Sequence, residues 1–142
     1  MQLKFHRYGF TLIEVVAVIT ILGILAAFAV PRFVALKTQA RAAAVEALAG
    51  SVRSGAALAH ALWLAQGQTS PVTMEGRSVT ILNGYPDRAT IDDTLVDKSG
   101  FTYAAGSGVF SRDGASGTCT VTYSQAPVDG APAVVVDTSG CN

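Results

Sequence analysis

Glu14 is the single charged residue in the 21-residue apolar run from Phe10 to Val30. A carboxylate inside a membrane helix costs roughly 3 kcal/mol at the bilayer centre, unless a cation compensates it or it reaches interfacial water. If the bond between Gly9 and Phe10 were cut, the new α-amine would lie one helical turn from Glu14, in the same chain or on a neighbouring subunit. The residue types and spacing therefore predict either an interfacial carboxylate or a carboxylate–amine pair.

The other residues that could do chemistry do not form a catalytic or metal-binding set. His6 lies near the N-terminus, so a Ser-His-Asp arrangement would depend on His60, which is more simply a partly exposed helix residue. Asp92, Asp93 and Asp97 suit a short solvated helix better than a catalytic pair of carboxylates. The two cysteines, separated by 21 residues and with no histidine nearby, lack metal-ligand spacing. The sequence predicts no enzyme, no metal site and no cofactor.

The N-terminal motif is specific enough to indicate a family. Residues 9–14, Gly-Phe-Thr-Leu-Ile-Glu, followed by the apolar run and by Pro31, resemble the N-terminus of type IV prepilins and the related pseudopilins. In that family a prepilin peptidase cuts after the glycine and methylates the new N-terminal phenylalanine. The resemblance implies cleavage between Gly9 and Phe10, N-methylation of Phe10, and neutralisation of an adjacent subunit's amine by Glu14. It covers roughly the first 60 residues.

Two other interpretations of the apolar run are possible. It could be an ordinary secretory signal, cleaved after the small-x-small sequence Ala27-Phe28-Ala29 so that the mature chain starts at Val30. It could also be an uncleaved signal anchor. The charge of Glu14 within the run, and a run length at the long end for a signal peptide, argue against the secretory signal.

Four segments are expected along the chain: a removed leader (1–9), a transmembrane and filament-core helix (10–30), an amphipathic helix (31–66) and a β-rich head (67–142). The formal net charge is zero, but residues 10–66 carry four basic and two acidic residues, a net of +2. Residues 67–142 carry four basic and eight acidic residues, a net of −4. This negative charge argues against nucleic acid as a partner of the head.

The flanking charges do not settle how the apolar helix crosses the membrane. Lys4 and Arg7 precede the run, whereas Arg32, Lys37 and Arg41 follow it, so the positive-inside rule points to a cytoplasmic head. The family resemblance and the two cysteines favour the opposite arrangement. We expect a cytoplasmic N-terminus, and a head that is periplasmic before assembly and extracellular afterwards.

The helix is expected to continue beyond the membrane. Pro31 cannot donate to the helical ladder and should kink or loosen the helix. Gly23 either permits close approach of a neighbouring helix or merely reflects the frequency of glycine in membrane helices. The alanine-rich stretch Ala40–Ala65 has apolar residues spaced as in an amphipathic helix. Trp63 is expected to close one end of the core, and stacking on a ligand is the less favoured alternative.

After residue 71 the pattern changes to short β-branched segments between glycine-rich turns, which predicts an α+β fold with an antiparallel sheet of about four strands on the helix. A capping box formed by Thr90 and Asp93 should open a short helix over Ile91 to Val96, and the glycines between 100 and 117 should mark turns. The predicted strands are residues 79–82, 108–111, 118–123 and 133–137.

Cys119 and Cys141 should be joined if the head lies outside the cytoplasm, closing a loop of roughly 20 residues. A cysteine pair at this place resembles the disulfide-bounded C-terminal region of type IV pilins. The sequence Asn83-Gly84-Tyr85-Pro86, with the alanine-rich helix, also resembles pilins of the mannose-sensitive haemagglutinin kind.

The resemblance implies a structural protein: an inner-membrane prepilin that is cleaved, methylated and polymerised into an extracellular pilus for adhesion or twitching motility. Its partners would be other pilin subunits, the prepilin peptidase and methyltransferase, the inner-membrane assembly machinery and, before assembly, membrane lipid. One alternative is a pseudopilin of a type II secretion system, although major pseudopilins usually hold calcium rather than a disulfide near the C-terminus. Another is a minor pilin that binds DNA.

Overall fold

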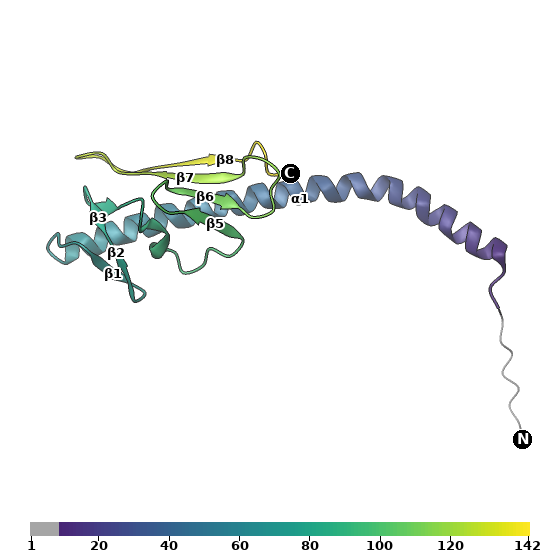
Figure 1. Ribbon diagram of the computed structural model, residues 1–142, viewed down its shortest axis with the longest axis horizontal. Coiled ribbons are helices and arrows are strands. Elements are labelled where there is room, and N and C mark those ends of the chain that lie inside the picture. Colours follow the sequence, from purple (N-terminus) through teal and green to yellow (C-terminus); the bar gives the residue numbers. More distant parts are fainter. Residues whose placement is uncertain (1–8) are drawn as a thin grey trace, which may run out of the picture. The chain divides into compact units, whose positions relative to one another are not determined.

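The computed structural model describes residues 9–142. The chain begins with one long helix, α1 (Leu12–Ala65), and continues into short antiparallel strands and one 3-10 turn (Figure 1). It divides into two units, Met1–Leu36 and Lys37–Asn142. The predicted leader, residues 1–9, lies outside the described residues except for Gly9. The boundary after Leu36 falls inside α1, so the two units share one continuous helix.

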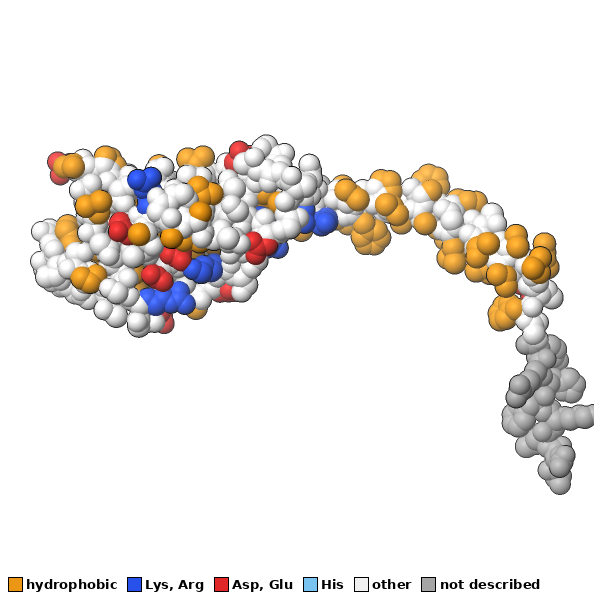
Figure 2. All heavy atoms as spheres, viewed as in Figure 1, with side chains coloured by type: hydrophobic (Ala, Val, Ile, Leu, Met, Phe, Trp, Pro, Cys, Tyr) orange, Lys and Arg blue, Asp and Glu red, His pale blue; other side chains and the backbone are white. Residues whose placement is uncertain are grey.

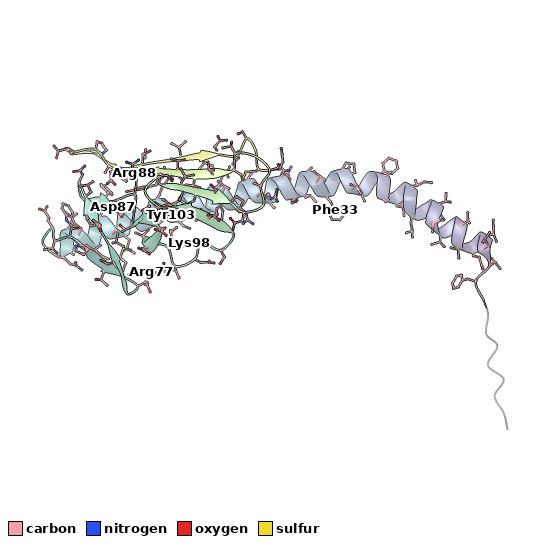
Figure 3. The ribbon with its side chains drawn as sticks, in the orientation of Figure 1. Phe33, Arg77, Asp87, Arg88, Lys98 and Tyr103 are labelled. Atoms are coloured by element: carbon pink, nitrogen blue, oxygen red, sulfur yellow. A yellow bond between two sulfur atoms is a disulfide. The ribbon has the colours of Figure 1, made fainter. Side chains whose placement is uncertain are left out.

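The first unit is a bare apolar helix. Every described residue from Gly9 to Leu36 is exposed, and apolar side chains cover the visible face of this part of α1 (Figure 2). Phe33, for example, is 71% exposed and points away from the helix (Figure 3). This part of α1 is long and apolar enough to cross a membrane by length and composition. Apart from the helix terminus and the carbonyl opposite Pro31, its backbone polar groups bond within the helix, as a membrane requires. Its side chains pack into no core within this unit.

The second unit is a head in which one face of α1 packs against a sheet. The face is made by residues at helical spacings of three or four, including the fully buried Val45, Ala49 and Val52. From the sheet, Phe110, Val121 and Tyr123 are also fully buried in the same cluster. Burial of this face fixes the helix in the head, which confirms the predicted α+β fold of a long helix packed on an antiparallel sheet.

The sheet has four antiparallel strands in the order β5-β6-β7-β8. The side chains of its two central strands alternate between the core and the outside, as the pleat requires: Phe110 and Val121, paired across β6 and β7, both face α1. The strands are β5 (Phe101–Ala104), β6 (Val109–Arg112), β7 (Thr120–Ser124) and β8 (Ala133–Asp137).

Two small hairpins precede the sheet and cover the last turns of α1. The first joins β1 (Val72–Met74) to β2 (Arg77–Val79), and the second joins β3 (Ile81–Leu82) to β4 (Tyr85–Pro86). Each has a two-residue turn with positive φ at both positions, 48° and 75° at Glu75-Gly76 and 53° and 83° at Asn83-Gly84. Two-residue turns of this kind match the twist of the strands that they connect. The hairpins build a second apolar cluster with Ala59, against which Trp63 packs.

Two expectations about the strands were wrong. The predicted strand over residues 79–82 is divided between β2 and β3 at Thr80, because Val72 pairs with Val79 while Ile81 pairs with Pro86 in a separate hairpin. Its place in the sheet is taken by β5, which lies where only turns were predicted. Only Phe101 and Tyr103 of β5 face the core. The alternation of apolar residues that would predict the strand is therefore weak, and it lies between Gly100 and Gly106.

The predicted capping box and helix over Ile91 to Val96 were also wrong. The segment is a 3-10 turn, η1 (Ile91–Thr94), and its N-cap Thr90 makes no side-chain cap bond. Asp87 binds the residues just before η1 instead, since its Oδ1 accepts from Ala89 N at 3.1 Å, Thr90 N at 2.9 Å and Thr90 Oγ1 at 2.6 Å. The Thr90 hydroxyl oxygen in turn accepts from Thr80 N at 3.0 Å, so it is committed to the neighbouring strand.

Candidate assembly site

The bond predicted to be cut lies in exposed, non-helical backbone. Gly9 and Phe10 precede the first helical residue, Leu12, and the Phe10 side chain is 85% exposed. A Cβ placed on Gly9 would meet no atom within 4 Å. No described residue therefore covers the peptide bond between Gly9 and Phe10, and the cleavage expected there stays a prediction.

Glu14 is held by a capping box at the start of α1. Its Oε2 accepts hydrogen bonds from Thr11 N at 2.8 Å and from Thr11 Oγ1 at 2.7 Å, and Glu14 N donates to Thr11 Oγ1 at 3.3 Å. These bonds satisfy backbone donors that a helix leaves unpaired at its first turn. The sequence analysis considered interfacial water and a cationic partner for Glu14 and missed Thr11, although Thr-x-x-Glu before an apolar run is the capping signature.

The capping box leaves half of the Glu14 carboxylate available. Both Thr11 donors bind Oε2, and Oε1 accepts no hydrogen bond from any residue between 9 and 142. A carboxylate has lone pairs for about four donors, so Glu14 can cap its own helix and still accept from a cation. Thr11 lies after the predicted cut, so its donors would remain in a chain that begins at Phe10.

The apolar helix offers the surface that any assembly would bury. Its large side chains from Leu12 to Leu36 are between 44% and 84% exposed. A Cβ on Gly23 would meet nothing within 4 Å, so a helix that exploits this glycine must come from another molecule. Pro31 lies inside α1, and its missing N–H leaves the Ala27 carbonyl without its helical donor. The predicted kink at Pro31 and packing role of Gly23 stay predictions.

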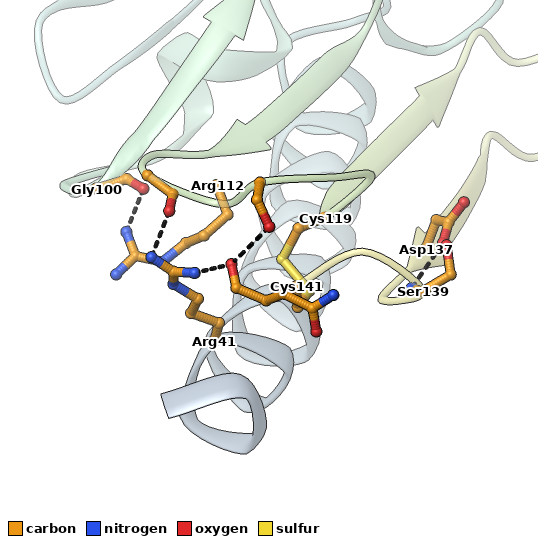
Figure 4. The surroundings of a disulfide bond; sticks show 10 residues. Arg41, Gly100, Arg112, Cys119, Asp137, Ser139 and Cys141 are labelled. Atoms are coloured by element: carbon orange, nitrogen blue, oxygen red, sulfur yellow. Dashed lines mark hydrogen bonds between the residues drawn. A yellow bond between two sulfur atoms is a disulfide. The ribbon is translucent and has the colours of Figure 1, made fainter. Parts of the chain in front are cut away.

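The disulfide lies at one end of the head. Cys119 and Cys141 are joined, with Cα atoms 4.7 Å apart, and both are buried (Figure 4). Arg41 of α1 donates to the carbonyls of Gly114 and Asn142, and Ser116 N donates to the Asn142 carbonyl at 3.2 Å. The bond predicted from the two cysteines therefore exists, and together with Arg41 it ties the C-terminal segment to the helix and to the β6–β7 loop.

The remaining chemical candidates are not brought together. His60 is partly buried, with Nδ1 2.6 Å from the Gly84 carbonyl, and Trp63 packs at the end of the core as expected. Asp92 pairs with Lys98, and Asp97 accepts from Ser99 Oγ and Ser99 N, which lowers the pKa of Asp97. Among residues 9–142, no three His, Cys, Asp or Glu side chains are grouped so that they could hold a metal ion.

Comparison with known proteins places the N-terminal segment in a class. Residues 4–30 match the family model described as the prokaryotic N-terminal methylation motif, which is the motif of the type IV pilin family. The description names a methylation motif and no catalytic activity. It contains Gly9, Phe10 and Glu14, as well as the helical run that follows them.

A particular relative points the same way. The chain is 61% identical over 51 residues to the type IV narrow pilus major component PilA5 of Thermus thermophilus. The match covers 36% of this chain and 44% of that protein, so the chain spans less than half the length of the curated relative it matches. No solved structure is significantly similar to the chain. The finer resemblance to pilins of the mannose-sensitive haemagglutinin kind stays a prediction.

Proposed function

We propose that this protein is a structural subunit of a type IV pilus. The precursor would sit in the inner membrane with its N-terminus in the cytoplasm and its head in the periplasm. A prepilin peptidase would cut between Gly9 and Phe10 and methylate Phe10, and the assembly machinery would add the subunit to an extracellular filament. The observation that carries the proposal is the fully exposed apolar helix with a single carboxylate at its start.

Polymerisation follows from the exposed apolar surface. In the bilayer the side chains of residues 12–36 contact lipid, and outside the membrane they must be covered by other helices. Removing apolar surface from water contributes about 25 cal/mol for each Å² that is buried. Copies of the same helix supply an equally apolar surface, so a filament with these helices at its centre buries the apolar helix of every subunit. Adhesion or motility would be a consequence of such a filament.

Glu14 would set the register of the subunits. Its Oε2 remains bound to Thr11, and its Oε1 would accept the N-terminal amine of Phe10 on a neighbouring subunit. Because a charge buried among apolar helices is costly, the arrangement that pairs each amine with a carboxylate is favoured over neighbouring registers. This pairing supplies specificity, whereas burial of the apolar helix supplies most of the free energy.

The intact mass and N-terminal residue of protein sheared from cells test cleavage, methylation and export together. We expect a chain that begins at Phe10 and carries one added methyl group. A chain that begins at Val30 would contradict the proposal, because the assembly helix would be gone. A Gly9→Leu variant should remain uncleaved in the membrane, while a Gly23→Ala control should be cut normally. Normal cutting of Gly9→Leu would exclude the proposed cleavage site.

A further inference from the structure

The head has a cavity of about 730 Å³ that is lined in part by the last turns of α1. Within the head, this end of α1 lies away from the C-terminus, next to which Cys141 lies (Figure 1). Four parts of the chain line it: the last turns of α1, the loop between α1 and β1, the β3–β4 hairpin and the loop between β7 and β8. The volume lies within the range of about 300–1,000 Å³ that is common for small-molecule sites. The proposed assembly of the N-terminal helix makes no use of this cavity.

One wall of the cavity is aromatic. His60 and Tyr85 are stacked, with ring centroids 4.3 Å apart and an interplanar angle of 7°, and the Trp63 ring lies 5.7 Å from His60. All three side chains are only partly buried. The His60 imidazole is also fixed in its orientation, because Nδ1 lies 2.6 Å from the Gly84 carbonyl. A carbonyl only accepts, so Nδ1 donates to it, and in the neutral imidazole Nε2 then presents a lone pair.

The polar groups of the cavity are mostly unpaired acceptors. Asn83 donates from Nδ2 to the Ala126 carbonyl at 2.9 Å, which leaves its Oδ1 open. Within residues 9–142, neither the Asp129 carboxylate nor the Tyr85 hydroxyl has a hydrogen-bond partner. No lysine or arginine lines the cavity. The site is therefore suited to a ligand with many hydroxyl donors and without negative charge.

Turns shape the rim of the cavity. Gln68 at 64°, Asn83 at 53° and Asp129 at 59° have positive φ and come from three different loops. Asn83 is the first residue of the two-residue turn between β3 and β4, and asparagine and aspartate adopt positive φ more readily than most residues.

We propose that this cavity binds a neutral saccharide. The C–H face of a pyranose ring would lie on the aromatic wall at Trp63, and its hydroxyls would donate to Asp129, to Asn83 Oδ1 and to His60 Nε2. Aromatic rings and hydrogen-bond acceptors are complementary to a ligand that has apolar faces and hydroxyl groups at its edges. The absence of a cation among the lining residues excludes phosphorylated and acidic sugars as preferred ligands.

Trp63 makes the proposal directly measurable, because it is the single tryptophan of the chain. Its fluorescence in the full-length protein, held in a polyoxyethylene detergent that contains no sugar, would be titrated with methyl glucoside, methyl galactoside, methyl mannoside and N-acetylglucosamine. Glycerol and tetramethylammonium chloride serve as comparison solutes. We expect a saturable change in Trp63 emission with at least one pyranoside and no saturable change with glycerol or tetramethylammonium.

Variants locate the binding. Asp129→Asn removes the charge and one acceptor oxygen, and Tyr85→Phe removes a hydroxyl; each should weaken binding about fivefold to tenfold. Asp93→Asn makes the same charge change outside the cavity and should leave binding unchanged. Three results would overturn the proposal: no saturable response to any pyranoside, saturation by tetramethylammonium instead, or affinity that neither cavity variant alters.

Discussion

The hydroxyl of Thr11 donates to the carboxylate of Glu14 across 2.7 Å, and Thr11 N donates to the same oxygen across 2.8 Å. Thr11→Val keeps the shape of the side chain but removes the hydroxyl. Losing an N-cap group of this kind costs about 1 kcal/mol of helix stability and frees the Glu14 carboxylate to rotate. We expect normal cleavage of Thr11→Val but fewer surface filaments, measured as the ratio of sheared to membrane-bound protein.

Thr11→Ser is the matched control, since serine keeps the hydroxyl and caps helices as well as threonine does. It should restore filaments to the level of the unaltered chain. If Thr11→Val and Thr11→Ser assembled equally well, the orientation of Glu14 by Thr11 would have no part in assembly.

Gly55 and Gly50 should respond oppositely to alanine. A Cβ on Gly55 would collide with the Thr94 hydroxyl and lie 3.0 Å from Thr94 Cβ, because the helix and η1 are in close contact there. Overpacking of this kind costs about 1–3 kcal/mol. A Cβ on Gly50 would meet nothing within 4 Å in the middle of α1, so Gly50→Ala should stabilise the helix by about 0.5–1 kcal/mol.

Thermal unfolding of the full-length Gly50→Ala and Gly55→Ala variants, monitored by circular dichroism, gives the midpoints to compare. The midpoint of Gly55→Ala should fall and that of Gly50→Ala should rise. The double variant Gly55→Ala/Thr94→Ser should recover little, because the hydroxyl that meets the new methyl group remains. Equal midpoints for Gly50→Ala and Gly55→Ala would show that η1 does not pack closely on α1.

The Cys119–Cys141 bond should contribute to the stability of the head. The two cysteines are separated by 22 positions, and closing a loop of this length stabilises a fold by about 3 kcal/mol on the chain-entropy model. Replacing both cysteines with serine should lower the free energy of unfolding by about that amount in urea titrations. A reductant should destabilise the unaltered protein but leave the double variant unaffected. If neither the double substitution nor the reductant changed the midpoint, the disulfide would have no stabilising role.

Much of the architecture was readable from the sequence because it depends on local patterns. The apolar run predicts the exposed helix, the alanine-rich spacing predicts its buried face, and three of the four strands of the main sheet carry β-branched residues between turns. The hairpin turns Glu75-Gly76 and Asn83-Gly84 were missed, although the second is a standard two-residue turn signal. The capping pair Thr11 and Glu14 was missed in the same way.

Other features had no local signal. Thr90 makes no side-chain cap at η1; its hydroxyl instead accepts from Thr80 N, in a different segment, and donates to Asp87. β5 becomes a strand because β6 is beside it, with Tyr103 opposite Phe110. The cavity likewise joins α1, a hairpin and a distant loop, which no periodicity relates. These features follow from tertiary contacts and require the folded chain.

Two tyrosines should make the head lose stability at alkaline pH. Burial, followed by the nearby charges of Asp92 and Asp87, raises the pKa of Tyr103 to about 12, and its hydroxyl donates to the Arg88 carbonyl (Figure 3). Burial is also the main cause that raises the pKa of Tyr123, whose hydroxyl donates to the Pro86 carbonyl at 2.7 Å.

The sign follows from the order in which the two states lose their protons. In the unfolded chain a tyrosine ionises near pH 10, whereas Tyr103 in the folded head keeps its proton until about pH 12. The stabilising effect of the neutral hydroxyl is therefore complete below pH 10 and is lost as the pH rises from 10 through 12.

Urea unfolding at pH 9 and at pH 11, with tyrosinate absorbance followed in parallel, should show a lower free energy of unfolding at pH 11. Tyr103→Phe should reduce the difference between the two pH values, and the variant that replaces both tyrosines should reduce it further. A free energy of unfolding that does not change between pH 9 and pH 11 in the unaltered protein would mean that neither hydroxyl is protected by the fold.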